Sequence, residues 1–209
     1  MKRVIKAPDI RKQEIIQVAK TLFESHGYEQ TSVEAIIRTI GIAKGTFYYY
    51  FKSKKDILVA LVEWLTLELV AFFQSIIDRH DLSAIEKLQI MLTSPEKQEK
   101  TVPVVMTALH KPENRQLQEQ LNIKTIQMIA PLIAQVIESG IQEGVFHTQS
   151  PLETVQFLMA GSAFILESGL FEWTKEKQHA LKQALQALTE TSLGAKQGSF
   201  DFITHPYWS

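Results

Sequence analysis

The stretch GIAKGTFYYYFKSKKDIL, residues 41–58, places five aromatic residues in a row, from Phe47 to Phe51. Lysines lie on both sides of this run, at position 44 and at positions 52, 54 and 55. A soluble protein seldom exposes such a cluster without a function for it, because large exposed apolar patches favour association. The first question is therefore which of these rings are buried and what the others touch.

A short helix over Lys44 to Phe51 divides the aromatic residues between two faces. Residues three and four positions apart share a helix face, so Phe47, Tyr50 and Phe51 are expected to be buried. The other face holds Gly45, Thr46 and Tyr49, with Lys44 and Tyr48 at its edge. An aromatic core explains the first set, but it does not explain two tyrosines beside four lysines. We therefore expect the second set to contact a partner.

The preceding segment, TSVEAIIRTIG, predicts a second short helix over Thr31 to Ile40. Thr31 and Glu34 have the spacing of a capping box, and Gly41 is a typical stop signal. Two short helices joined by GIA form a helix-turn-helix. The outward side chains of its second helix can enter a major groove, where hydroxyls bond phosphates or bases and rings pack against thymine methyl groups.

Helical periodicity continues along the rest of the chain, and no segment alternates with the period of a strand. Further helices are expected near residues 54–79, 82–93, 103–110, 113–143, 151–171 and 174–193. The sequence therefore predicts an all-α fold of about nine helices. The aromatic tail after residue 195 is compatible with either a docked or a loose segment.

Composition and charge limit the classes of function. Residues 1–60 contain 11 Lys and Arg against 6 Asp and Glu, whereas the remainder contains 11 against 17. A basic end on an acidic body indicates a polyanionic partner, although charge alone favours chance clustering equally. The absence of cysteine excludes disulfides and thiolate metal sites. No apolar run approaches the roughly 20 residues of a membrane span, so we expect a cytoplasmic protein.

Residues 10–60 resemble the Tet repressor (TetR) family of transcriptional regulators. The resemblance rests on an apolar first helix, on HGY at residues 26–28 with TS at 31–32, and on the opening stretch. It implies an N-terminal three-helix DNA-binding domain, joined by a long fourth helix to a C-terminal effector and dimerisation domain. The expected division is a DNA-binding domain over residues 1–55, a ligand-binding and dimerisation domain over 56–195, and a tail over 196–209.

The resemblance also assigns contacts to double-stranded DNA, with a pseudo-palindromic operator as the expected target. The residues facing the groove would be Lys44, Gly45, Thr46, Tyr48 and Tyr49. Thr31 or Ser32 would bond a phosphate at the start of the second helix, where free N–H groups favour anions. Lys54 would reach a phosphate from the start of the fourth helix.

We therefore expect a sequence-specific DNA-binding regulator, a repressor released from its operator by a small, mainly apolar ligand. The alternative is a helical DNA-binding protein without an effector pocket, controlled by a protein partner. The candidate ligand-binding residues are mostly apolar, and for each methionine the filling of a gap in the core is an alternative. They are Trp64, Phe72, Met91, Met106, Leu109, Met128 and Phe157, with His110 and Glu167 as polar groups.

The last two helices are expected to form a homodimer interface. They combine leucines with small residues, so each can bury one face in its own domain and another on a partner. The candidates are Ala160, Phe164, Leu181, Ala184, Leu185 and Leu188. Enzymatic activity and cofactors are not expected, because the six histidines have no metal-ligand spacing and no GxSxG, P-loop or GxGxxG motif occurs.

Overall fold

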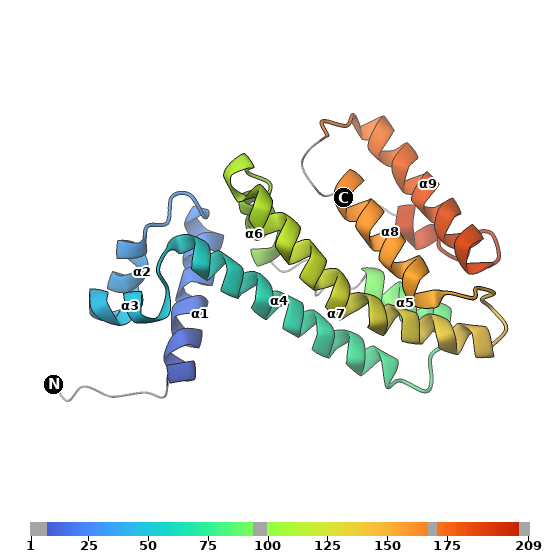
Figure 1. Ribbon diagram of the computed structural model, residues 1–209, viewed down its shortest axis with the longest axis horizontal. Helices are drawn as coiled ribbons and strands as arrows, with labels where there is room; N and C mark the ends of the chain where they lie inside the picture. Colours follow the sequence, from blue (N-terminus) through green and yellow to red (C-terminus); the bar gives the residue numbers. More distant parts are fainter. Residues whose placement is uncertain (1–7, 94–99, 167–170, 205–209) are drawn as a thin grey trace. The chain divides into compact units, whose positions relative to one another are not determined.

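The computed structural model describes residues 8–93, 100–166 and 171–204, and every regular element in these ranges is a helix (Figure 1). This confirms the predicted all-α fold. The helices are α1 (Pro8–His26), α2 (Val33–Ile40), α3 (Lys44–Tyr50), α4 (Lys54–Ile77), α5 (Ala84–Thr93), α6 (Thr101–Leu109), η2 (Pro112–Asn114), α7 (Arg115–Gln142), α8 (Pro151–Ile165), α9 (Lys175–Leu193) and η3 (Asp201–Thr204).

Several helix ends differ from the predicted ones because local capping decides them. Helix α2 begins at Val33 rather than at Thr31, since Ser32 is the N-cap and its Oγ accepts a 3.1 Å hydrogen bond from the Ala35 N–H. Gly41 ends α2 as predicted, with a left-handed φ of 73° that favours glycine. Helix α8 ends at Ile165, before the predicted end at residue 171.

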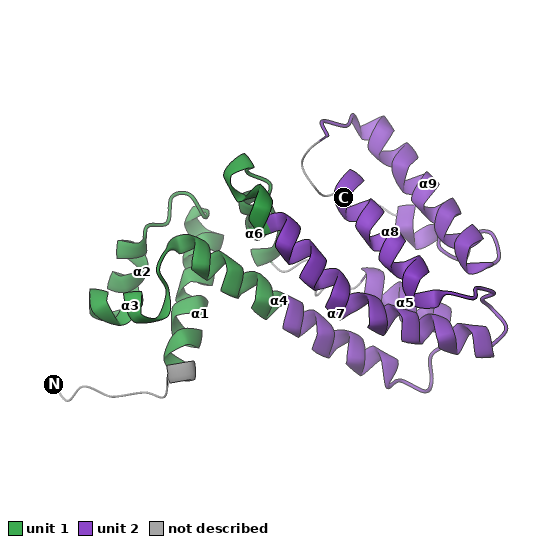
Figure 2. Cartoon of the chain, in the orientation of Figure 1, with its two compact units in different colours: residues 1–65, 99–117 green, residues 66–98, 118–209 purple. Residues whose placement is uncertain are grey.

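The chain divides into two compact units (Figure 2). Unit 1 consists of residues 1–65 and 99–117, and unit 2 consists of residues 66–98 and 118–209. Helix α4 therefore begins in unit 1 and ends in unit 2, while α6 belongs to the unit that contains the helix-turn-helix. The predicted division into functional domains, with boundaries at residues 55 and 195, concerns function rather than compactness and stays a prediction.

Each unit has its own apolar core. In unit 1 the first four helices contribute most of the fully buried side chains, which include Ile15, Phe23, Ile36, Phe47, Ile57 and Leu58. In unit 2 the core includes Phe73, Leu88, Met91, Ala130, Val136, Phe146, Phe200, Phe202 and Ile203. The described part of the C-terminal tail is thus docked, because three of these residues follow α9.

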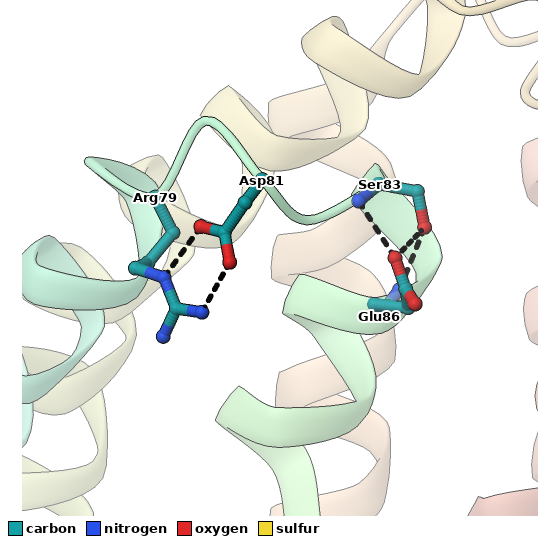
Figure 3. Close-up of polar contacts among 4 residues, drawn as sticks. All are labelled: Arg79, Asp81, Ser83 and Glu86. Carbon is teal, nitrogen blue, oxygen red and sulfur yellow. Dashed lines mark hydrogen bonds and ion pairs between the residues drawn. The ribbon is translucent and has the colours of Figure 1, made fainter.

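The connection between α4 and α5 is held by side-chain caps (Figure 3). The guanidinium of Arg79 donates two hydrogen bonds to the carboxylate of Asp81, which lowers the pKa of that carboxyl to about 2. Ser83 and Glu86 form a capping box, in which the Glu86 carboxylate accepts from the Ser83 N–H at 2.9 Å and from its hydroxyl at 2.7 Å. These bonds fix the start of α5 within unit 2.

Candidate nucleic-acid interface

Buried aromatic rings hold α3 in place. Helices α1 and α2 pack together, and α2 packs on α3. Phe47 is fully buried and Phe51 almost so, with their ring centroids 6.1 Å apart. Both were expected in the core, but Tyr50, expected there too, is only half-buried. Because one side of α3 is anchored in this way, its opposite side faces outward.

The outward side of α3 carries Lys44, Gly45, Tyr48 and Tyr49, which we call the recognition face. All four are exposed, and Tyr49 retains 78% of its accessible surface. Thr46, assigned to the same face, is half-buried. A Cβ atom added to Gly45 would meet no other atom within 4 Å, so the protein's own packing does not require glycine there. The open space beside Gly45 is available to a molecule that approaches the backbone closely.

The recognition face combines rings with positive charge. The Lys44 Nζ lies 5.8 Å from the centroid of the Tyr48 ring and 3.9 Å from a carboxylate oxygen of Glu34. The Tyr49 and Tyr50 rings meet edge to face at 4.9 Å. The ion pair is exposed on both sides, and such pairs are weak, so Lys44 is available to another anion. Hydroxyls, rings and an ammonium therefore lie together on one short helix.

The two candidates for a phosphate contact at α2 have different surroundings. Thr31 retains 2% of its surface, and its hydroxyl donates to the Gly27 carbonyl at 2.8 Å and to the Leu22 carbonyl at 3.3 Å. Its side chain therefore fixes the turn between α1 and α2 and is not placed to reach DNA. Ser32 is exposed at the first turn of α2 and is the candidate that remains.

Lys54 already has partners inside unit 1. Its Nζ donates to the Tyr28 carbonyl at 2.7 Å and to the Glu29 carbonyl at 3.2 Å, and it lies 4.3 Å from the centroid of the Tyr28 ring. Burial lowers the pKa of Lys54 and raises the pKa of Tyr28 to about 12. This geometry fastens the start of α4 to the α1–α2 turn. The phosphate contact of Lys54 stays a prediction, with one ammonium proton left for it.

Sequence reasoning missed a second set of contacts within unit 1, one of which reaches the same turn. Lys111, before η2, forms a 2.8 Å ion pair with Glu29, and the Lys55 Nζ donates to the Glu113 carbonyl at 3.4 Å. The Thr101 hydroxyl at the start of α6 donates to the carboxylate of Glu24 on α1. We call these contacts the η2 junction. No local signal could have revealed them, because the partners lie far apart in the sequence.

The predicted ligand-binding residues are divided between the two units. Trp64, Met106, Leu109 and His110 belong to unit 1, and Phe72, Met91, Met128 and Phe157 belong to unit 2, while Glu167 lies outside the described residues. The lining role assigned to Phe157 finds no support in the single protomer, because this ring is 81% exposed. Met106 is also exposed, whereas Met91 is fully buried.

The surroundings of Trp64 and His110 bear on their predicted roles. The Trp64 ring lies 4.7 Å from the Lys20 Nζ, so its face is used by a cation of α1. The His110 Nε2 is buried and has no hydrogen-bond partner among the described residues. An unpaired buried nitrogen is costly, so His110 keeps its place as a candidate for a polar contact with a ligand.

Helices α8 and α9 pack against each other. Each of the two helices also carries a stripe of exposed apolar side chains. On α8 it contains Phe157, Ala160, Gly161 and Phe164, and on α9 it contains Ala184 and Leu188, with half-buried Leu181. Leu185, also predicted for the interface, is half-buried and packs partly against the unit 2 core, and its interface role stays a prediction. We call these stripes the α8–α9 face. Apolar surface of this kind on a protomer is typical of an oligomer interface.

Other classes of site find no support in the described ranges. No group of three or more His, Asp or Glu residues in them could hold a metal ion. None of their helices is long and apolar enough to cross a membrane.

Comparison with known families matches both halves of the chain. Residues 15–61 match the model described as bacterial regulatory proteins, tetR family, and residues 100–191 match the Tetracyclin repressor-like, C-terminal domain. An uncharacterized HTH-type transcriptional regulator of Bacillus subtilis, YfiR, is 25% identical over 90% of this chain and 95% of its own. The fatty acid metabolism regulator protein of the same organism is 26% identical over 63% of this chain and 68% of its own.

Solved structures show the same fold. A TetR-family regulator from Pectobacterium atrosepticum has a TM-score of 0.64 at 17% identity, covering 90% of this chain and 95% of its own. RolR in complex with resorcinol has a TM-score of 0.65 at 14% identity, covering 95% of each chain. The recognition face lies within the first matched region. The chain therefore belongs to the TetR family of DNA-binding transcriptional regulators.

Proposed function

We propose that this regulator is a cytoplasmic repressor that binds a pseudo-palindromic operator as a homodimer and leaves it when a small, mainly apolar ligand binds. The observation that carries the DNA-binding part is the recognition face, where Lys44, Tyr48 and Tyr49 are exposed beside an open backbone at Gly45. Tyrosine hydroxyls and an ammonium suit phosphates and base edges, and the rings suit thymine methyl groups.

The α8–α9 face supports the homodimer. Its exposed side chains are aliphatic or aromatic and are interspersed with alanine and glycine, so two copies can approach closely. A two-fold axis brings the same patch of both protomers together and provides two recognition helices. Two such helices read half-sites that are about one helical turn, roughly 34 Å, apart or slightly more.

The apolar character of the ligand rests on the composition of the interior. The hydrophobic cluster of unit 2 consists of aliphatic and aromatic side chains and Met91, and the buried Lys87 and Glu190 of this unit already bond backbone groups. Charged ligands need paired partners to offset their desolvation. The names of two similar proteins agree with this class, since one is a fatty acid metabolism regulator and another has bound resorcinol.

The η2 junction offers a route from the ligand to the DNA. Helix α6 and η2 are in the same compact unit as the helix-turn-helix, and they hold the α1–α2 turn through Lys111 and Glu29. A ligand that favours a different position of α6 would therefore move the helices that present α3. To reduce operator affinity tenfold, its preference for that state must be worth about 1.4 kcal/mol.

The test is an operator-binding assay with and without ligand. An operator is first selected from random DNA with the purified protein, and its affinity is then measured by fluorescence anisotropy in the presence of 1-dodecanol or resorcinol. We expect at least one apolar compound to lower operator affinity and to raise the melting temperature of the DNA-free protein. If no sequence is enriched, the DNA-binding proposal is wrong. If an operator is found but a wider panel of apolar compounds changes neither quantity, the ligand proposal is wrong.

A further inference from the structure

The segment after α9 turns back and enters the core of unit 2. Helix α9 ends at Leu193, and the residues from Gly198 to Thr204, here called the C-terminal turn, finish in η3 (Figure 1). Phe200, Phe202 and Ile203 are almost completely buried. They are part of the same cluster as Met91 on α5 and Ile137 on α7. Three large apolar side chains near the end of the described chain thus occupy the interior of the C-terminal unit.

The surroundings of the C-terminal turn form an apolar site around it. Its η3 helix packs on α5 and α9. The Phe200 ring lies 6.0 Å from the Phe146 ring and 5.4 Å from the Phe202 ring. Phe146 in turn lies so close to Gly140 of α7 that a Cβ there would come within 2.2 Å of the ring. The C-terminal turn is therefore surrounded by α5, α9 and the ring of Phe146, for which Gly140 leaves room.

Hydrogen bonds from the C-terminal turn to α9 converge on one carboxylate oxygen. The Oε1 of Glu190 accepts from the Gly198 N–H at 3.0 Å and from the Phe200 N–H at 3.1 Å. It also accepts from the Gln186 Nε2 at 3.0 Å. Glu190 is itself more than nine-tenths buried. Among the described residues, the Glu190 carboxylate accepts both of these hydrogen bonds from the backbone of the turn, so this polar attachment to α9 depends on one side chain.

We propose that the C-terminal turn is the resident occupant of an apolar binding site in unit 2, and that a ligand carrying an aromatic ring or a branched aliphatic group binds by taking its place. This inference rests on the proposed function, since it says where an apolar effector binds. Protein interiors are close-packed, so a ligand that entered without displacing a side chain would overpack the core. Displacement of the turn exchanges one set of apolar contacts for another.

The site includes residues that the sequence had already suggested for the ligand. Met91 is in the same buried cluster as Phe200 and Phe202, and Phe72 packs against that cluster. Leu185 of α9 packs against it as well. Occupation of the site would therefore be felt by α4, α5 and α9, of which α9 also contributes to the α8–α9 face.

The first test compares two full-length variants with the wild type, using N-phenyl-1-naphthylamine as a neutral, fluorescent apolar probe. Glu190→Gln keeps the size of the side chain but weakens the hydrogen bonds that hold the turn. The probe can bind only while the turn is out of the site, so the apparent affinity for the probe falls as the turn fills the site for more of the time. Weaker hydrogen bonds let the turn leave more often. Glu190→Gln should therefore bind the probe about tenfold more tightly than the wild type does. The control is Glu138→Gln, which changes an exposed glutamate of α7 and should bind as the wild type does.

The second test uses the wild type alone and does not depend on the folding of a variant. Hydrogen exchange is measured with and without saturating probe. Displacement should speed the exchange of the Gly198 and Phe200 amides and slow that of amides inside α7. Equal probe affinity of Glu190→Gln and wild type, slower exchange at Gly198 and Phe200, or no binding of the probe to either protein would each overturn the proposal. Operator binding is measured in parallel, so loss of the proposed DNA function would appear separately.

Discussion

Two exposed aromatic surfaces of this protein have different chemistry. The recognition face on α3 presents Tyr48 and Tyr49 beside Lys44, whereas the α8–α9 face presents Phe157, Phe164 and Leu188. Tyrosine combines a ring with a hydroxyl, and with a nearby cation it suits a polar, negatively charged partner. Phenylalanine and leucine offer only apolar area, which is best buried against another apolar surface. The comparison teaches that exposed rings indicate an interface, but their polar neighbours decide its partner.

The largest effect should come from a charge on the α8–α9 face. Leu188→Glu would place a carboxylate in the dimer interface and separate the protomers. Because two linked half-sites bind much more tightly than one, operator affinity should fall about 100-fold or more. Sedimentation velocity and anisotropy measure the two quantities. Gln183→Glu adds the same charge at an exposed position of α9 outside the apolar stripe and should stay dimeric. A dimeric Leu188→Glu protein with normal operator affinity would contradict the interface.

The second prediction concerns the recognition face itself. Tyr49→Ala should weaken specific operator binding by about 1–3 kcal/mol if this side chain reads a base. Tyr49→Phe separates the hydroxyl from the ring: a phenylalanine that restores affinity would indicate packing on a thymine methyl group. Binding to random DNA should change much less. Equal losses on operator and random DNA would mean that Tyr49 contacts phosphate and carries no sequence information.

The third prediction distinguishes two lysines near the DNA-binding surface. Lys54→Ala removes a cation that bonds the Tyr28 and Glu29 carbonyls, so it should destabilise the protein by about 1–2 kcal/mol. Lys44→Ala should leave stability nearly unchanged but lower the slope of log affinity against log salt by about 1. Chemical denaturation and salt titrations measure these effects. A reduced salt slope in Lys54→Ala, without a loss of stability, would support its predicted phosphate contact.

The smallest effect should come from the η2 junction. The hydrogen bond from Lys111 holds the pKa of Glu29 below its ordinary value. A carboxyl whose pKa is lower in the folded state adds stability above its unfolded pKa and loses that stability as the pH falls through the folded pKa. Because the pair is partly exposed, its contribution should be at most about 1 kcal/mol.

Glu29→Gln should therefore be less stable than the wild type at pH 7, and the difference should disappear between about pH 5 and pH 3. Urea denaturation across this range measures it. If the η2 junction transmits ligand binding to the DNA-binding helices, Glu29→Gln should also change how strongly the ligand lowers operator affinity. A constant difference between the two proteins at every pH would show that the ion pair is not its cause.

The sequence by itself determined the local structure and the family. The period of 3.6 residues identified the helices, and the left-handed Gly41 ended α2 where expected, because such signals depend only on neighbouring residues. The same periodicity divided the run Phe47–Phe51 into buried and exposed rings, with Tyr50 as the exception. Side chains of the recognition face could be assigned in this way because a helix fixes the direction of each residue relative to the next.

Only the tertiary structure decided which polar groups already have partners and which apolar residues share a core. Lys54 looks available in the sequence, but its partners include the carbonyl of Tyr28, which lies 26 residues away in the chain. Phe157 looks like a lining residue, yet it is exposed, while the C-terminal turn fills the unit 2 core. The physical reason is that such contacts join residues far apart in the chain. A local sequence pattern does not indicate which distant group will lie beside a given residue.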